Sequence, residues 1–272
     1  GQGRTPHVGV TIKPFVAKDQ LLDYLEAIMR VYNRFGRRDN KYKARIKILV
    51  SETGAEEFTR LVDEEFEAQR DAEKIVLPQA EVDRITQYFA PPAFEDLPET
   101  SDVLEAAKAK DEAFARWVRV NVRPHKQAGY GIVTISCKPI GAPPGDVTDA
   151  QMDVTADLAE RYSLDEIRIT HEQNMVLPHV KLDDLFDLYQ ELDSAGLSTA
   201  NYELISDIIC CPGLDYCNLA NARSIPVAQD LQNTFADLER QDDIGELKIK
   251  ISGCINACGH HHVGHILSLI HI

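Results

Sequence analysis

The sequence predicts an α+β protein built around a split β-α-β-β-α-β unit in its second half. Residues 129–137 alternate in polarity and are rich in β-branched side chains, which is typical of a strand. From Thr148 onward, apolar residues recur at helical spacing, and Thr148 is a suitable N-cap. The remaining elements follow as strands at 166–170 and 175–177, a helix at 182–192 and a strand at 204–209. This order is that of a ferredoxin-like half-domain.

Composition limits the classes of protein and partner. A chain of 272 residues has room for two domains, and 44% hydrophobic with 27% charged residues is typical of a globular protein. The net charge of −15 argues against nucleic acid and against an anionic membrane as partners. The chain has no apolar run of membrane-spanning length and no secretory pattern at its start. Its six cysteines fit metal ligation in a reducing, cytoplasmic setting better than a disulfide scaffold.

The first half is predicted to be helical. Residues 18–35 form an amphipathic pattern that ends at Gly36, and residues 54–69 form a second one. An apolar segment, 46–50, lies between them. Seven basic residues gather from the end of the first helix onward: Arg34, Arg37, Arg38, Lys41, Lys43, Arg45 and Lys47. They are either a solvated face or part of a site for an anionic ligand.

Residues 71–115 are predicted to be a helical connector. Prolines punctuate short acidic helical pieces, and the clearest helix covers 101–114 with Ser101 as its N-cap. Its acidic faces require no function.

Four cysteines fall in two close pairs, Cys211 with Cys217 and Cys254 with Cys258. Paired thiolates suit zinc, copper(I) or an iron–sulfur cluster. The five-residue gap in the first pair counts against zinc, whereas iron–sulfur clusters accept wider spacings. Buried core cysteines are the alternative, and this is the role expected for Cys137 and Cys210. Helices are expected at 215–223 and 227–240, followed by a strand at 246–251 that leads to the second pair.

Five motifs together resemble the sirohaem-dependent nitrite/sulfite reductase family. The most specific are Cys-Pro-Gly-Leu-Asp-Tyr-Cys at 211–217 and Ser-Gly-Cys-Ile-Asn-Ala-Cys-Gly at 252–259. Ile-Arg-Ile-Thr-His-Glu-Gln-Asn at 167–174 is similar to a cofactor-facing segment of the family. The runs at 38–47 and 125–130 are similar to the end of its first sirohaem-binding half and to the start of its second ferredoxin-like half. The resemblance covers essentially residues 1–266.

The resemblance implies two coupled cofactors. A 4Fe–4S cluster would be held by four thiolates, those of Cys211, Cys217, Cys254 and Cys258. In the family the last of these, here Cys258, also bridges to the iron of sirohaem. The residues expected to contact sirohaem are Arg168, Gln173, Asn174 and Asn256. Histidines 260–262 and 265 are expected to have structural or hydrogen-bonding roles near the haem edge in preference to metal ligation.

The resemblance also implies a domain plan that is truncated at both ends. Residues 1–70 would be the end of a first sirohaem-binding domain, and residues 71–115 would be a helical connector. Residues 116–208 would form the second ferredoxin-like half-domain. Residues 209–272 would form the cluster- and sirohaem-binding domain, with an aberrant tail from about 267. The arginines and lysines that clamp the substrate are expected upstream of residue 1, so no catalytic residue is assigned and the chain alone is expected to be inactive.

The implied activity is the six-electron reduction of sulfite to sulfide. Reduction of nitrite to ammonia on the same cofactors is the alternative substrate assignment. A non-catalytic iron–sulfur electron carrier and a structural zinc module are alternatives of other classes. The expected partners are sulfite or nitrite and an electron donor, either ferredoxin or a flavoprotein reductase, with neither nucleic acid nor a membrane involved.

Overall fold

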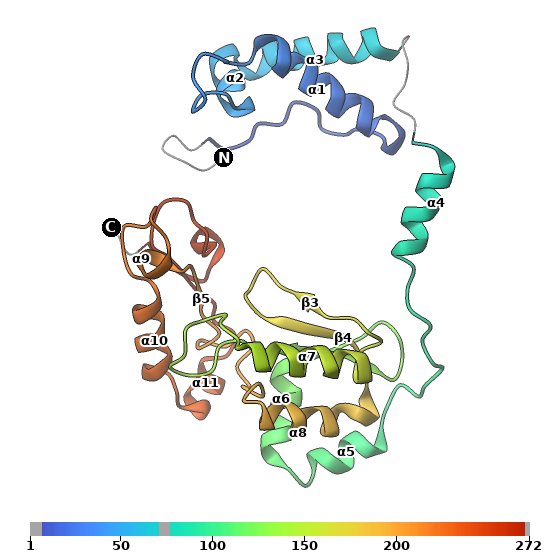
Figure 1. Cartoon of the computed structure of the whole chain (residues 1–272), viewed down its shortest axis with the longest axis vertical. Coiled ribbons are helices and arrows are strands. Elements are labelled where there is room, and N and C mark those ends of the chain that lie inside the picture. The colour runs from blue at the N-terminus through green and yellow to red at the C-terminus, as the bar shows by residue number, and fades with distance from the viewer. Residues whose placement is uncertain (1–6, 71–76, 270–272) are drawn as a thin grey trace. The chain divides into compact units, whose positions relative to one another are not determined.

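The computed structural model describes residues 7–70 and 77–269 and divides into two compact units. Unit 1 comprises residues 1–91 and unit 2 residues 92–272, and each is described by itself (Figure 1). Within the described residues, no helix combines the length and the apolar character needed to cross a bilayer.

Unit 1 is helical, as its periodicity predicts. A short turn of 3-10 helix, η1 (Lys18–Gln20), leads into α1 (Leu21–Phe35), followed by α2 (Ile46–Thr53), α3 (Ala55–Arg70) and α4 (Gln79–Tyr88). The apolar segment expected at 46–50 is the first part of α2, which Gly54 separates from α3 with a φ of 87°. The core side chains come from α1, α2 and α3: Tyr24, Ala27, Val31, Leu49, Phe58, Val62 and Phe66.

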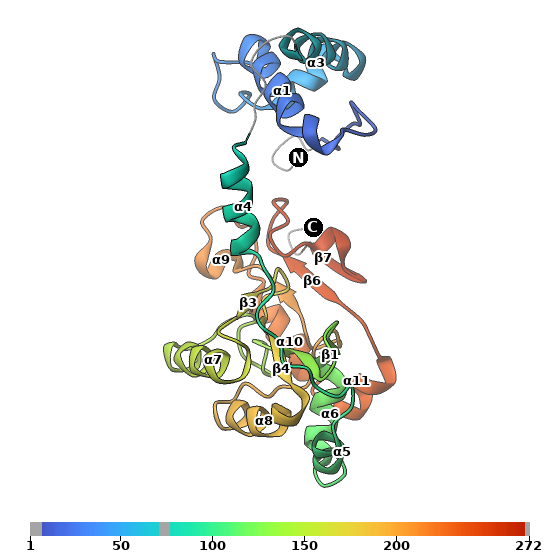
Figure 2. The same cartoon turned by 90° about the vertical axis from the view of Figure 1, so that its right-hand side faces the viewer.

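Unit 2 contains the predicted ferredoxin-like sheet. Its strands are β1 (Val122–Pro124), β2 (Tyr130–Ile135), β3 (Arg168–Ile169) and β4 (Met175–Lys181), ordered β1-β2-β4-β3 and all antiparallel. The two helices predicted for this half-domain are α7 (Asp149–Tyr162), with the predicted N-cap Thr148, and α8 (Leu185–Ser194), which follows the 3-10 turn η2 (Leu182–Asp184). They lie side by side, since the Arg161 guanidinium pairs with Glu191 (Figure 2).

The helix expected at 101–114 is two helices, α5 (Asp102–Lys108) and α6 (Glu112–Asn121). Ser101 caps the first, as predicted, and Asp111 caps the second through a 2.9 Å hydrogen bond from the Phe114 amide. A residue that caps a new N-terminus ends the continuity of a longer pattern. α6 supplies two of the largest fully buried side chains of the unit, Phe114 and Trp117.

The strand expected at 204–209 differs most from the sequence expectation. Only β5 (Ile209–Cys210) is a strand, and it joins a second, parallel sheet with β6 (Ile249–Ser252) and β7 (Ile266–Leu269) in the order β5-β6-β7. β1 occupies the place beside β2. The chain turns away before β5 because Glu203 has a φ of 65° and buried Asp207 is held by Lys138.

The second sheet carries short helices. α10 (Ile225–Thr234) contributes Ala228 to the core of this sheet. The helix expected at 215–223 is the single turn α9 (Gly213–Tyr216), and the one expected at 227–240 is divided into α10 and α11 (Leu238–Ile244), because Asp237 caps α11. The 3-10 turn η3 (His261–Val263) precedes β7. The tail expected from about 267 thus includes part of β7, and 270–272 lie outside the described residues.

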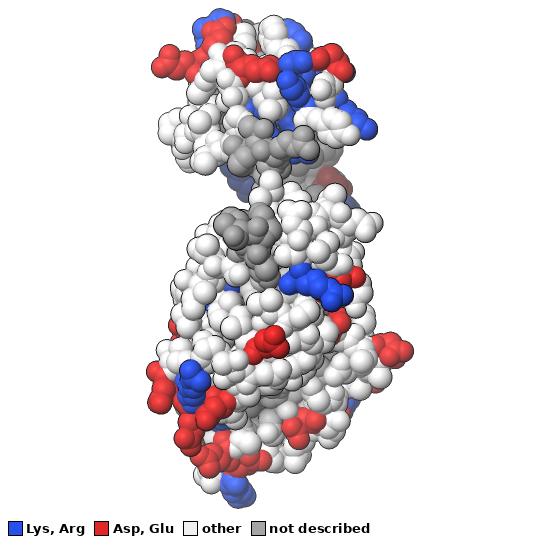
Figure 3. Space-filling view, turned by 90° about the vertical axis from the view of Figure 1, so that its left-hand side faces the viewer, with Lys and Arg blue, Asp and Glu red and all other residues white. Residues whose placement is uncertain are grey.

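The acidic charge is unevenly distributed over the face of unit 2 seen in Figure 3. Most of this face is uncharged, and acidic side chains gather toward its lower end. Such a surface has no continuous cationic area of the kind that a polyanion requires.

Candidate cofactor site

The two cysteine pairs follow the carboxyl-terminal ends of neighbouring strands in the parallel sheet. Cys211 directly follows β5, and Cys254 lies two residues beyond β6, the neighbouring parallel strand. The Cys211 amide donates to the Ile251 carbonyl at 3.1 Å, and the Gly253 amide donates to the Cys211 Sγ at 3.1 Å. The first thiol therefore already accepts a backbone hydrogen bond from the second cysteine loop.

Glycines allow the backbones of the two loops to come this close. Gly213 has a φ of 57°, and a Cβ there would lie 2.3 Å from the Ser224 Oγ. A Cβ at Gly253 would lie 2.7 Å from the Ala222 carbonyl oxygen, and one at Gly259 would lie 2.1 Å from the Ile251 carbonyl oxygen. Close backbone approach explains these glycines in physical terms.

The four thiols of these loops interact electrostatically. Burial raises the pKa of Cys258, and the neighbouring thiols of Cys211, Cys254 and Cys217 raise it further, because like charges disfavour ionisation. Four mutually repelling thiolates suit a cationic iron core, so their chemistry fits the predicted cluster. As they stand, no three His, Cys, Asp or Glu side chains in the described chain are close enough to hold a metal ion. The ligand set therefore stays a prediction.

The other two cysteines are buried outside this set. Cys210 is 2% exposed, and burial raises its pKa to about 12. Cys137 is 3% exposed, and burial also raises its pKa. The packing role expected of both residues requires inert, protonated thiols.

The amides of Gln173 and Asn174 are both engaged inside unit 2. Gln173 donates to the Cys210 carbonyl at 2.8 Å and accepts from the Cys210 amide at 2.9 Å. Asn174 is 1% exposed, accepts from the Cys137 amide at 3.1 Å and donates to Asp207 at 3.2 Å. Their expected contact with sirohaem stays a prediction, and the contacts seen here are internal.

A buried ion pair beside Asn174 carries no signal in the sequence pattern. The side chain of Lys138 is 0% and that of Asp207 6% exposed, and the two are 2.5 Å apart. The Lys138 ammonium also donates to the Asn174 Oδ1 at 3.1 Å and to the Glu172 carbonyl. Burial raises the pKa of Asp207, and the adjacent ammonium opposes that shift. The pair is found only once the fold brings residues 69 positions apart together.

Arg168 lies at the surface and belongs to a separate polar chain. Its side chain is 59% exposed and pairs with Glu166 at 2.5 Å. The other Glu166 oxygen lies 3.0 Å from the His179 Nε2, and the His179 Nδ1 lies 3.2 Å from the His125 Nε2. The Arg168 guanidinium is thus largely exposed to solvent but already paired with a carboxylate.

Asn256 is half-buried between Cys254 and Cys258. The histidines that follow lie near one another. His171 comes from the loop between β3 and β4, and its ring centroid lies 6.1 Å from that of His260. The ring centroids of His260 and His262 are 6.3 Å apart. His265 accepts from the Lys248 amide at 3.1 Å, which is the structural role expected for it.

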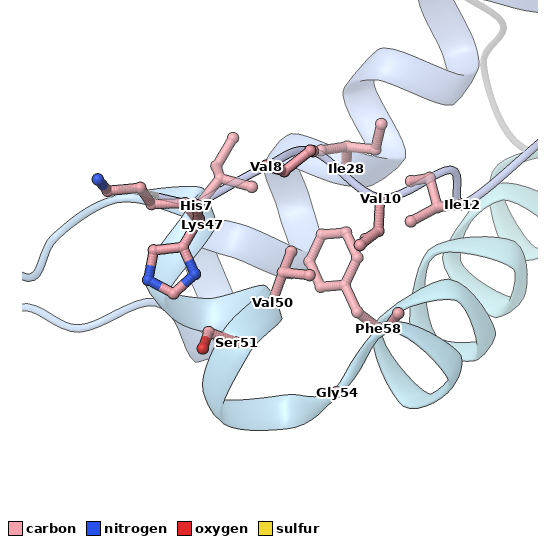
Figure 4. A pocket seen from close by; sticks show the side chains of 13 residues that line it. His7, Val8, Val10, Ile12, Ile28, Lys47, Val50, Ser51, Gly54 and Phe58 are labelled. Carbon is pink, nitrogen blue, oxygen red and sulfur yellow. The ribbon is translucent and has the colours of Figure 1, made fainter. Parts of the chain in front are cut away.

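Unit 1 has a cavity of about 560 Å³ that is distinct from the cysteine loops (Figure 4). Apolar side chains form most of it: Val8, Val10, Ile12, Ile28, Val50 and Phe58. Of the basic residues noted in the sequence, Lys47 lines this cavity, whereas Arg34 and Arg37 pair with acidic side chains. Five of the seven basic residues are exposed: Arg34, Arg38, Lys41, Lys43 and Arg45.

A ferredoxin-like sheet that leads into a cysteine-bearing parallel sheet defines the class, an α+β cofactor protein. Two sequence models of one family match the chain. Residues 1–70 match the nitrite and sulphite reductase 4Fe-4S domain, and residues 125–195 match the nitrite/sulfite reductase ferredoxin-like half domain. The chain belongs to the nitrite and sulfite reductase family. The four cysteines lie outside both matched ranges.

Named relatives cover nearly the whole chain. It is 28% identical to the chloroplastic ferredoxin–nitrite reductase of Zea mays, over 90% of this chain and 37% of the relative. The ferredoxin–nitrite reductase of Synechococcus elongatus is 30% identical, over 88% and 39%. Sulfite reductase [ferredoxin] 1 of Mycolicibacterium paratuberculosis is 24% identical, over 95% and 40%. The chain spans about two fifths of the length of these relatives.

A solved structure supports the fold. The NirA protein of Mycobacterium tuberculosis superposes with a TM-score of 0.59 at 23% identity, covering 94% of this chain and 40% of NirA. The expected fold class is confirmed. The model that matches residues 1–70 is that of a 4Fe-4S domain, which agrees with the expected cluster.

Proposed function

We propose that this chain forms part of an enzyme that reduces sulfite to sulfide by six electrons at a coupled sirohaem and 4Fe–4S centre. The observation that carries the proposal is the convergence of two cysteine loops at one edge of the parallel sheet, with the Gly253 amide on the Cys211 sulfur. Reduction of nitrite to ammonia is the second candidate, favoured by the names of the relatives at 28% and 30% identity.

The proposed ligands of the cluster are Cys211, Cys217, Cys254 and Cys258, with Cys258 also reaching the sirohaem iron. Cys258 is the exposed member of the set, so its sulfur is accessible to a second group. When bound, the two cofactors would supply the electrons for the reduction one at a time. Arg168, with its exposed guanidinium, and Asn256, within the second cysteine loop, are the proposed contacts for sirohaem carboxylates and edges.

The proposed electron donor is ferredoxin, because the relatives' names include it. A flavoprotein reductase is the alternative donor. We place the enzyme in the cytoplasm, where a reducing environment keeps exposed thiols such as that of Cys258 available for the cluster.

Two neighbouring cysteines provide a sharp test of the ligand set. The chain is reconstituted with ferrous iron and sulfide, and its iron, labile sulfide and visible absorption are measured. Cys211→Ala should abolish cluster formation, whereas the adjacent Cys210→Ala should retain it, because the Cys210 side chain belongs to the apolar core of the parallel sheet. Equal retention in both variants would contradict the assignment, and a stoichiometric zinc content without iron would favour a structural zinc module.

A second measurement separates the enzyme from an electron carrier. Tetrapyrrole is extracted from the longer protein that contains this chain, and its turnover of sulfite and nitrite is compared under the same donor. Iron and sulfide without tetrapyrrole would indicate a carrier. The ratio of turnover rates would decide between the two anions.

A further inference from the structure

Strand β5, which delivers Cys211, is an edge strand of very short length. It has two residues, and its only strand neighbour in the described sheet is β6. Edge strands leave a row of backbone donors and acceptors unpaired, and a two-residue strand has little cooperative pairing to hold it. Something besides β6 must therefore hold the strand that sets the position of the first thiol.

The side chain of Gln173 fills this place. Its amide nitrogen donates to the Cys210 carbonyl at 2.8 Å, and its amide oxygen accepts from the Cys210 backbone amide at 2.9 Å. A primary amide that pairs with both groups of one residue reproduces the exchange made by a neighbouring strand. Gln173 thus completes the free edge of β5 immediately before Cys211.

Gln173 is itself fixed by the ferredoxin-like unit. Its φ of 60° lies in the left-handed region, which a glutamine adopts only where its surroundings require it. The following residue, Asn174, is buried and bonded to Lys138 and Asp207. Gly145 packs against the other side, since a Cβ there would lie 3.0 Å from the Gln173 Cβ.

We infer that Gln173 is a positioning residue that sets Cys211 for the cluster by acting as the missing neighbour of β5. Its connection runs from the buried Lys138–Asp207 pair through Asn174 to Gln173, and from there to the backbone of Cys210. In this position, the Cys211 sulfur accepts a hydrogen bond from the Gly253 amide at 3.1 Å. The last step, toward the cluster, rests on the proposed function, whereas the control of β5 does not.

Selective ¹⁵N-cysteine labelling tests the inference on the chain as it stands, because six cysteines give six amide signals. Three of them report different bonds: Cys210 donates to Gln173, Cys211 to Ile251, and Cys137 to Asn174. In Gln173→Ala, amide exchange should accelerate by ~fivefold or more at both Cys210 and Cys211, since an amide hydrogen bond is lost. Cys137 should be unchanged, and so should all six amides in Gln229→Ala, which removes a 2.9 Å amide bond to the Gly141 carbonyl.

Acceleration at Cys210 alone would overturn the inference, because the sheet would then hold Cys211 without Gln173. If Cys137 also accelerates in Gln173→Ala, the unit has opened as a whole, and Gln173→Glu decides. The glutamate keeps an acceptor for the Cys210 amide, so it should restore slower exchange than alanine at Cys210 and Cys211. Equal exchange in the two variants would refute the positioning role.

A cluster readout tests the final step separately. After reconstitution with iron and sulfide, Gln173→Ala should change the electron paramagnetic resonance spectrum and the midpoint potential of the cluster, while Gln229→Ala leaves both unchanged. Unchanged spectra and potential in Gln173→Ala would overturn the role toward the cluster. Failure of every variant and of the unaltered chain to take up iron would contradict the proposed ligand set, and the amide exchange would still decide the control of β5.

Discussion

Replacing Lys138 with methionine removes the charge partner of a buried carboxylate. The two side chains are 0% and 6% exposed and lie 2.5 Å apart. The same ammonium donates to the Asn174 Oδ1 and to the Glu172 carbonyl, so the substitution also leaves these two acceptors without a donor. Breaking a buried pair on one side costs about 3–5 kcal/mol, because the remaining charge is desolvated and unpaired. Since a domain is stable by only about 5–15 kcal/mol, Lys138→Met should remove a large part of the stability of unit 2.

Urea unfolding followed by tryptophan fluorescence measures this loss in unit 2 alone. The chain has one tryptophan, Trp117, and it is 1% exposed in the core of that unit. With a slope of roughly 2 kcal/mol per molar urea, a loss of this size lowers the midpoint by about 1.5–2.5 M. The matched control is Lys181→Met, whose partner Glu95 is 60% exposed, and a surface pair of this kind contributes about 0–1 kcal/mol.

Two further measurements identify the unpaired carboxylate as the cause. Lys138→Met with Asp207→Asn removes both charges and keeps one amide oxygen, which can accept from Asn174 or from the Glu203 amide, so the double variant should be more stable than Lys138→Met. Burial raises the pKa of Asp207, so the folded state takes up a proton more readily than the unfolded state as the pH falls. Lys138→Met lacks the ammonium that opposes this rise in the pKa, so its deficit in stability should narrow as the pH falls. A midpoint equal to that of Lys181→Met, or a deficit independent of pH, would refute the reasoning.

Three more substitutions probe a titrating side chain, a cysteine loop and a helix start. Burial lowers the pKa of His125 from 6.5. The unfolded chain therefore binds a proton at this residue more readily than the folded chain, and stability is lost as the pH falls below about 6.5. His125→Phe should flatten the pH dependence of the urea midpoint between pH 7.5 and pH 5.5, and an unaltered slope would contradict this prediction. Gly213→Ala should cost more than the ~1–2 kcal/mol of a left-handed alanine, because its Cβ would meet a neighbouring side chain at 2.3 Å; Gly196→Ala, with a φ of 69° and the nearest neighbouring atom at 3.9 Å, is the control, and equal melting temperatures would refute the steric argument. Ser101→Ala removes the cap of α5 and should cost about 0.5–2 kcal/mol in urea unfolding, and a loss below 0.3 kcal/mol would mean that the cap is dispensable.

The sequence by itself determined which residues could bear soft-metal chemistry. The spacing of Cys211 with Cys217 and of Cys254 with Cys258 marks two ligand pairs, because thiolates that share a metal must be close along the chain or be delivered by loops. Periodicity also determined α1, and the turn residue Thr148 determined the start of α7, since caps and apolar spacing are local properties. These elements depend on few partners distant in sequence.

Helix breaks were harder to place from the sequence. Asp111 and Asp237 each start a new helix inside a stretch that reads as one, because a cap competes with continued apolar spacing and the outcome depends on packing. The same limit applies to β5, whose two residues are too few to give a strand signal.

Only the tertiary structure decided what the polar residues beside the cysteines contact. The sequence predicts that Gln173 and Asn174 face a cofactor. In the structure their side-chain amides bond to Cys210, Cys137 and Asp207. The ion pair of Lys138 with Asp207 has no periodic or spacing signal, because its members are 69 positions apart and meet only in the folded unit. Local sequence fixes which groups a segment carries, whereas the partner of a buried polar group is chosen by the requirement that its desolvation be compensated.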